Sequence, residues 1–304
     1  MNILVGGDQH LTNHKPKNRI DDFEWTVMRK FREELQIAND NNCGYVIFPG
    51  DLFESHKENH GVVQQVMDIL NEFPKITILV VAGQHDQKYH NDDLSGTAFQ
   101  TLVTSGYFHL LGADPYETSC TGCHIYGASW KQDIPEIASA HTTNILVTHR
   151  MVIDEKLWEA QEDFTRANHL LLKTKFDLIV SGDNHQRFTA TKGDRHLVNM
   201  GSMMRSTIAQ INHEPAVTIY DSKLKTIDVI PLMIDPIEKV MSIERAEREK
   251  DQKKQTTAFA ESIKGEIGSA KIILSYAEAV EKELEKLDED DEVADIIEDC
   301  FAEE

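Results

Sequence analysis

The stretch Ile3-Leu4-Val5-Gly6-Gly7-Asp8-Gln9-His10 decides the fold, because it joins a short apolar run to a carboxylate and an imidazole. A short apolar run that ends in glycine is typical of a buried strand in an α/β sheet. Residues that follow such a strand lie at its carboxyl end, where open α/β sheets bind their ligands. The stretch therefore predicts a sheet edge that carries ligand groups.

The same arrangement of an apolar run followed by polar ligand groups occurs five times along the chain. The other four cases are Gly50-Asp51 after 45–48, Gly83-Gln84-His85-Asp86 after 76–81, Thr148-His149 after 145–147, and Gly182-Asp183-Asn184-His185 after 178–180. One such motif alone is typical of an exposed turn. Five of them predict that three carboxylates, three imidazoles and one side-chain amide meet at one edge.

Carboxylates gathered beside apolar strand ends need neutralisation. Each buried charge costs several kcal/mol, roughly, unless a partner of opposite charge offsets it. Bound cations are the simplest partner for such a cluster. Oxygen and imidazole donors without a thiolate favour manganese, iron, zinc or magnesium over copper(I) or an iron–sulfur cluster.

The order of these motifs resembles that of calcineurin-like metallophosphoesterases from residue 2 to about residue 231. Asp8-Gln9-His10-Leu11 and Asp51-Leu52-Phe53 are most similar to the SbcD-type nuclease subunit of double-strand-break repair complexes. The resemblance implies an α/β fold, a two-sheet metallophosphoesterase sandwich flanked by helices, with two divalent metal ions. It also implies that one ion is held by Asp8, His10, Asp51 and His185, and the other by Asp51, Gln84, His149 and Asp183.

The resemblance further gives His85 a catalytic role as a non-ligand acid or charge stabiliser above the phosphate. Three positions depart from the family pattern: Gln84 replaces Asn, Asp183 replaces His, and Glu54 replaces a His for which the nearby His56 can substitute. The hard oxygen of Asp183 favours manganese, with magnesium possible, over zinc. A weakened second metal site is the alternative. Possible substrate contacts are His14, Glu54, His56 and Ser202.

Apolar periodicity predicts helices over 20–41, 61–73, 94–105 and 155–174. Short strands predicted between 188 and 231 suggest the second sheet of the sandwich. We therefore expect a catalytic domain over residues 1–235, followed by a helical acidic C-terminal region over residues 236–304.

The C-terminal region carries an apolar stripe made of Ile272, Ile273, Tyr276, Val280, Leu284 and Leu287. Such a stripe packs on its own domain, forms a homodimer, or docks on a partner. In the family that the chain resembles, the corresponding region engages an SbcC-type ATPase. Homodimerisation and ATPase docking both remain open.

The chain has a formal net charge of −21, which at first argues against DNA as a partner, because DNA affinity depends largely on Lys and Arg. However, residues 281–304 contain thirteen acidic and two basic residues, so about half of this charge lies in the tail.

No apolar run is long enough to span a membrane, and the first strand is needed for Asp8, which argues against a signal peptide. With only four cysteines, we expect a cytoplasmic protein with no membrane association.

The ligand motifs predict a metal-dependent phosphodiester hydrolase, and the family resemblance implies a DNA exonuclease or endonuclease of SbcD type that uses a dinuclear metal centre. One alternative is a phosphodiesterase or phosphatase that acts on a small nucleotide or a phosphoprotein. Another is a non-catalytic interaction scaffold whose acidic tail binds a partner.

Overall fold

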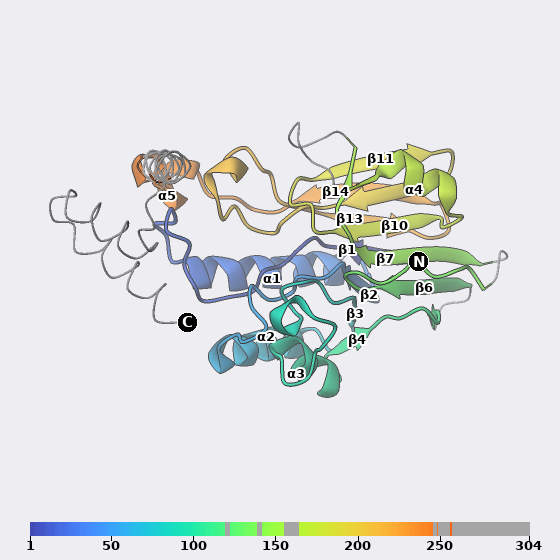
Figure 1. Cartoon of the computed structure of the whole chain (residues 1–304), viewed down its shortest axis with the longest axis horizontal. Coiled ribbons are helices and arrows are strands. Elements are labelled where there is room, and N and C mark those ends of the chain that lie inside the picture. The colour runs from blue at the N-terminus through green and yellow to red at the C-terminus, as the bar shows by residue number, and fades with distance from the viewer. Residues whose placement is uncertain (119–121, 139–141, 155–163, 246–247, 249–255, 257–304) are drawn as a thin grey trace, which may run out of the picture. The chain divides into compact units, whose positions relative to one another are not determined.

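A computed structural model describes residues 1–118, 122–138, 142–154, 164–245, 248 and 256 (Figure 1). The chain divides into two units, Met1–Ile243 and Glu244–Glu304. The first unit includes the short helix α5 (Ile237–Val240), and just beyond it the Ser242 amide donates to the Asn18 carbonyl at 2.9 Å. The apolar stripe predicted for 272–287 lies outside the described residues.

The first sheet has six strands, and it carries three of the five motifs. Strands β1 to β4 are parallel, whereas β13 is antiparallel to β1 and pairs Tyr220 with Ile3. The strand order is β14 (Thr226–Pro231), β13 (Ala216–Asp221), β1 (Asn2–Val5), β2 (Tyr45–Phe48), β3 (Thr77–Val80) and β4 (Phe108–Leu110).

The second sheet also has six strands, and it carries the other two motifs. Its four inner strands are parallel, and one antiparallel strand closes each edge. The order is β11 (Phe188–Lys192), β12 (Arg195–Asn199), β10 (Leu178–Gly182), β7 (Thr143–His149), β6 (Cys123–Ala128) and β5 (Tyr116–Glu117). A separate two-stranded sheet joins β8 (Val152–Ile153) to β9 (Thr165–Arg166).

Alternation along the strands builds three apolar layers. In β1, Leu4 packs against the helices while Ile3 and Val5 pack against the second sheet, as the period of two requires. On the far side of the second sheet, Leu146 and Ile179 pack against a helix. The fold is therefore an α/β sandwich with two central sheets and helices outside, as the sequence predicts (Figure 1).

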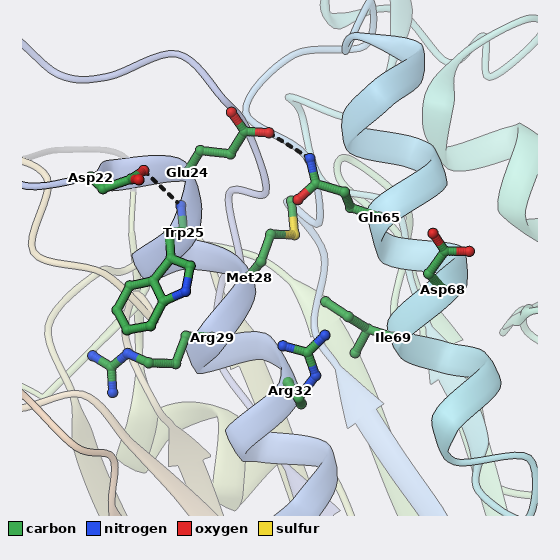
Figure 2. Close-up of a pocket in the computed structure, with 9 residues that line it drawn as sticks. All are labelled: Asp22, Glu24, Trp25, Met28, Arg29, Arg32, Gln65, Asp68 and Ile69. Carbon is green, nitrogen blue, oxygen red and sulfur yellow. Dashed lines mark hydrogen bonds between the residues drawn. The ribbon is translucent and has the colours of Figure 1, made fainter.

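The helices follow the sequence prediction in the first half of the unit. They are α1 (Phe23–Asp40), α2 (His60–Glu72) and α3 (Ala98–Thr104). The predicted starts of the first and third helices, at residues 20 and 94, are wrong. Asp22 caps α1 through its side chain, which accepts from the Trp25 amide at 3.2 Å, and Thr97 caps α3 by accepting from the Gln100 amide at 3.1 Å. An open cavity of about 400 Å³ lies between α1 and α2 and includes Trp25 and Arg29 (Figure 2).

Two predictions for the second half need correction. Of the helix predicted over 155–174, residues 155–163 lie outside the described part of the chain. The described remainder is helical only over α4 (Ala167–Lys173), because Thr165 and Arg166 form β9 instead. The strands between 188 and 231 do not all belong to the second sheet, since β13 and β14 join the first sheet beside β1. None of the described helices is long and apolar enough to cross a membrane.

Candidate metal centre

The loops after β1, β2 and β10 turn sharply at three predicted metal ligands. His10, Asp51 and Asp183 have φ angles of 47°, 46° and 73°, in the left-handed region that residues with a Cβ rarely occupy. Such backbone strain persists only where surrounding structure fixes it, and it is commonly found at functional sites. The three side chains are thus directed by strained turns, which periodicity could not predict.

Hydrogen bonds hold these loops together. The Asp51 carbonyl accepts from the Gln9 and His10 amides at 3.1 and 3.0 Å, and the Asp8 carboxylate accepts from the Asp183 amide at 2.9 Å. Gly83 is required at this point because a Cβ on it would collide with the Asp51 carboxylate. The close approach of the backbone therefore explains the glycine that precedes Gln84.

One group of ligands surrounds His10. Its Nε2 lies 3.1 Å from Nε2 of His185, and the same His185 atom lies 3.7 Å from Oδ2 of Asp8. When two nitrogens each bind the same ion at about 2.1 Å, the distance between the two nitrogens is similar to the 3.1 Å that separates these two Nε2 atoms. Ligand atoms of Asp8, His10 and His185 all lie within 4.8 Å of one another, as do those of His10, Asp51 and His85. Three of the four ligands predicted for the first ion therefore converge, and Asp51 is linked to them through His10.

The second set is joined to the first through Asp51. Its Oδ2 lies 3.3 Å from Nε2 of His149. The other ring nitrogen of His149 is 2.8 Å from the Pro49 carbonyl, so Nδ1 carries a proton and, when the ring is neutral, Nε2 presents a lone pair toward the carboxylates. The Gln84 amide donates to Oδ1 of Asp183 at 3.1 Å. All seven predicted ligands thus lie in one connected cluster.

The donor atoms of this cluster fit a divalent metal ion. Among the buried atoms without a hydrogen-bond partner in the described residues are four of the predicted ligand atoms, Asp8 Oδ1, Asp51 Oδ2, Gln84 Oε1 and His149 Nε2. A buried polar atom without a partner costs about 1–3 kcal/mol. Two cations held by the predicted ligand sets would satisfy all four lone pairs, whereas a proton could satisfy only one or two.

The electrostatics of the cluster also favour added positive charge. Burial raises the pKa of Asp8 to about 7. Burial opposes protonation of His149, but the charge of Asp51 outweighs it and raises the His149 pKa to about 10. In return, although burial works against ionisation, His149 holds the pKa of Asp51 below its usual range. The carboxylates thus attract protons where bound metal would otherwise supply the charge.

Asp86 supports the centre without being one of the predicted ligands. Its fully buried carboxylate accepts from the backbone amides of Leu52 at 3.1 Å, Phe53 at 3.1 Å and Gly83 at 2.9 Å. It therefore fixes the two loops that carry Asp51 and the amide ligand. Sequence reasoning assigned Asp86 no role, although it ends the Gly83-Gln84-His85-Asp86 motif.

Glu54 lies beside a metal ligand in the structure. Its Oε2 is 2.9 Å from Nδ1 of His10. Burial opposes protonation of His10, but hydrogen bonding to Glu54 and the nearby carboxylates raise the His10 pKa to about 9. The carboxylate orients the imidazole so that its Nε2 faces His185.

His85 lies at the edge of the cluster. Its Nδ1 is 2.8 Å from the Glu54 carbonyl, which leaves Nε2 for a substrate. The proposed substrate contacts differ in position. His14 is exposed, and the His56 ring packs 5.2 Å from that of Tyr89. The buried Ser202 hydroxyl donates to the Met204 carbonyl at 2.7 Å and accepts from Gln210 at 2.8 Å, so it stabilises its own loop.

Comparison with known proteins gives the family of the chain. A family model for the calcineurin-like phosphoesterase superfamily domain matches residues 1–222. The DNA double-strand break repair protein Mre11 of Thermoplasma acidophilum is 27% identical over 100 residues, which are 32% of this chain and 26% of that protein. The matched segment therefore spans about a quarter of the relative's length.

Two solved structures match the chain at low sequence identity. The protein TT1561 of Thermus thermophilus has a TM-score of 0.49 at 12% identity, covering 76% of this chain and 98% of that one. An archaeal phosphodiesterase has a TM-score of 0.41 at 16% identity, covering 76% and 100%. The match of the family model to most of the chain shows that it belongs to the calcineurin-like phosphoesterase superfamily, whose members are metal-dependent phosphoester hydrolases.

Proposed function

We propose that this phosphoester hydrolase is a manganese-dependent phosphodiesterase that acts on DNA ends, as a nuclease subunit of SbcD type. The observation that carries the proposal is the convergence of Asp8, His10, Asp51 and His185 with His85 beside them. The partial similarity to an Mre11 protein supports DNA as the substrate. The hard carboxylate of Asp183 favours manganese or magnesium over zinc.

The chemistry divides between the metal and the protein. When bound, divalent ions supply Lewis acidity and neutralise the charge of the phosphate. The chain holds their ligands in fixed positions through Asp86 and Glu54. His85 is oriented by the Glu54 carbonyl, and in its imidazolium form its Nε2 can donate a proton to the departing oxygen.

A cavity beside the ligands has room for a nucleotide. Its volume is about 570 Å³, and Asp183, His185, Arg187 and His213 belong to its lining. The guanidinium of Arg187 can pair with a phosphate oxygen through two hydrogen bonds. Arg187 thus supplies one positive charge for a phosphate in a cavity that Asp183 and Glu214 also line.

The decisive assay is cleavage of single-stranded and duplex DNA with Mn²⁺ by the wild-type chain and by His85→Ala. We expect cleavage by the wild type, and a loss of about 100-fold or more in the variant, since general acid catalysis contributes roughly 10²–10⁴-fold. Equal cleavage by the two proteins would remove His85 from the mechanism. No metal-dependent cleavage by the wild type would refute the nuclease proposal.

The second candidate is a phosphodiesterase or phosphatase for a small nucleotide. The observation that favours it is the net charge of −21, which weakens attraction to a polyanion but not to a small ester. Turnover of small phosphate esters that competing DNA does not inhibit would support this candidate.

An SbcC-type ATPase or a second copy of the chain is the proposed partner of residues 236–304.

A further inference from the structure

Three aromatic side chains stand beside the reacting centre, and we call Tyr89, His90 and Trp130 the aromatic rim. The Tyr89 side chain is 69% exposed, although large apolar rings are normally covered. Tyr89 and His90 are consecutive non-glycine residues with φ angles of 49° and 54°. This is a costly conformation, and it presents the Tyr89 ring to solvent.

Neighbouring groups hold this strained turn in place. The Lys88 amide donates to the Asp93 carbonyl at 2.9 Å, and the Asn91 amide donates to the Lys88 carbonyl at 2.9 Å. The Lys88 ammonium also donates to the Ser95 hydroxyl at 3.0 Å. Tyr89 is thus exposed because hydrogen bonds fix its loop in this conformation.

The rim is attached to the segment that carries the amide ligand. Nδ1 of His90 lies 3.1 Å from the Gln84 carbonyl, and the Trp130 amide donates to the Ala82 carbonyl at 2.9 Å. The His90 ring centroid is 6.1 Å from that of His85 and 6.1 Å from that of Trp130. The rim therefore begins within one nucleotide length of the centre where phosphate would react.

Lysines accompany both outer rings. The Lys131 ammonium lies 3.8 Å from the centroid of Trp130, and that of Lys57 lies 5.5 Å from the centroid of Tyr89. Aromatic faces that alternate with cations are the surface on which unpaired bases stack while their phosphates are neutralised. A base inside a duplex has neighbours on both faces, so it cannot use such a surface.

We propose that the aromatic rim binds an unpaired nucleobase next to the scissile phosphate, so that the substrate is single-stranded nucleic acid or a frayed end. This inference rests on the proposed function in one respect, namely that the phosphate which reacts belongs to a nucleotide. It adds a substrate class and two specificity-determining residues, Tyr89 and Trp130.

The test compares a single-stranded oligonucleotide with an abasic strand of the same length, which keeps the sugar–phosphate chain and lacks the bases. The full-length chain, Tyr89→Ala and Trp130→Ala are assayed with Mn²⁺ for cleavage, and by fluorescence anisotropy for binding. We expect each alanine variant to lower the preference for the base-bearing strand about 10-fold to 100-fold, the range that one lost stack implies. Trp130→Phe should recover most of the preference, because it restores an aromatic face.

The matched control is Trp25→Ala. Trp25 is 59% accessible, more exposed than the half-buried Trp130, with the Arg29 guanidinium 5.2 Å from its ring, and it lines the cavity between α1 and α2 (Figure 2). This variant should keep the wild-type preference. The inference would be overturned if the wild type showed no preference for the base-bearing strand, or if both rim variants kept the wild-type preference.

The two proposals fail in different ways. If the wild type hydrolyses methyl 4-nitrophenyl phosphate but cleaves no DNA, the proposed nuclease function fails. Binding anisotropy still tests the rim in that case, because it needs no turnover. Base-dependent binding that Trp130→Ala weakens would support the rim as a nucleotide site, and base-independent binding would refute it.

Discussion

Replacing Asp86 with Asn tests whether a buried non-ligand carboxylate holds the metal centre together. The carboxylate accepts from three backbone amides, at 3.1 Å from Leu52, 3.1 Å from Phe53 and 2.9 Å from Gly83. Asn has one acceptor oxygen, and its amide group would face a backbone donor. One or two buried amides would therefore lose their partner, and each such loss costs about 1–3 kcal/mol.

We expect Asp86→Asn to lower the free energy of unfolding by about 2–4 kcal/mol, measured by urea denaturation without metal. The loops that carry Asp51 and Gln84 should shift, so affinity for Mn²⁺ measured by calorimetry should fall about 10-fold to 100-fold. The matched control is Asp92→Asn, which changes an exposed carboxylate six residues away. A change below about 0.5 kcal/mol in Asp86→Asn, with unaltered affinity, would refute the reasoning.

Three further predictions concern single positions. Glu54→Gln removes the charge beside Nδ1 of His10, so Mn²⁺ affinity should fall about 10-fold or more in calorimetry; unchanged affinity would contradict the pairing. Gly83→Ala places a Cβ against the Asp51 carboxylate and should abolish metal binding, whereas Gly112→Ala, with open space around it, should bind as the wild type does. Burial raises the pKa of Glu34 from 4.5 to about 8, so the unfolded chain loses this proton first and stability should decrease as pH rises from 4.5 to 8. Glu34→Gln should flatten that part of the stability profile in urea denaturation, and an identical slope would show that Glu34 is not its source.

Much of the fold could be predicted from the sequence because its signals are local. The apolar runs before Asp8, Asp51 and His149 each become a buried strand, and a helix lies between β1 and β2 as its periodicity predicts. The partner of β1 could not be predicted in this way. Antiparallel pairing of Ile3 with Tyr220 joins residues more than 200 positions apart, and no periodicity within either strand encodes it.

The identities of the ligands could be predicted, but the groups that position them could not. The side chains of Asp8, His10 and His185 meet because the loops after β1 and β10, which belong to the two facing sheets, converge. The support that Asp86 and Glu54 give depends on the exact course of the loops. That course includes left-handed turns at ligand positions, which tertiary contacts impose on residues that do not favour them.

The most direct test of the account is the number of metal ions that one chain binds. Calorimetric titration of metal-free protein with Mn²⁺, checked by elemental analysis, should give two ions for the wild type, and at most one for Asp51→Asn, since Asp51 belongs to both ligand sets. Binding of no Mn²⁺ by the wild type, or two ions in both proteins, would contradict the claim that these seven side chains form a dinuclear centre.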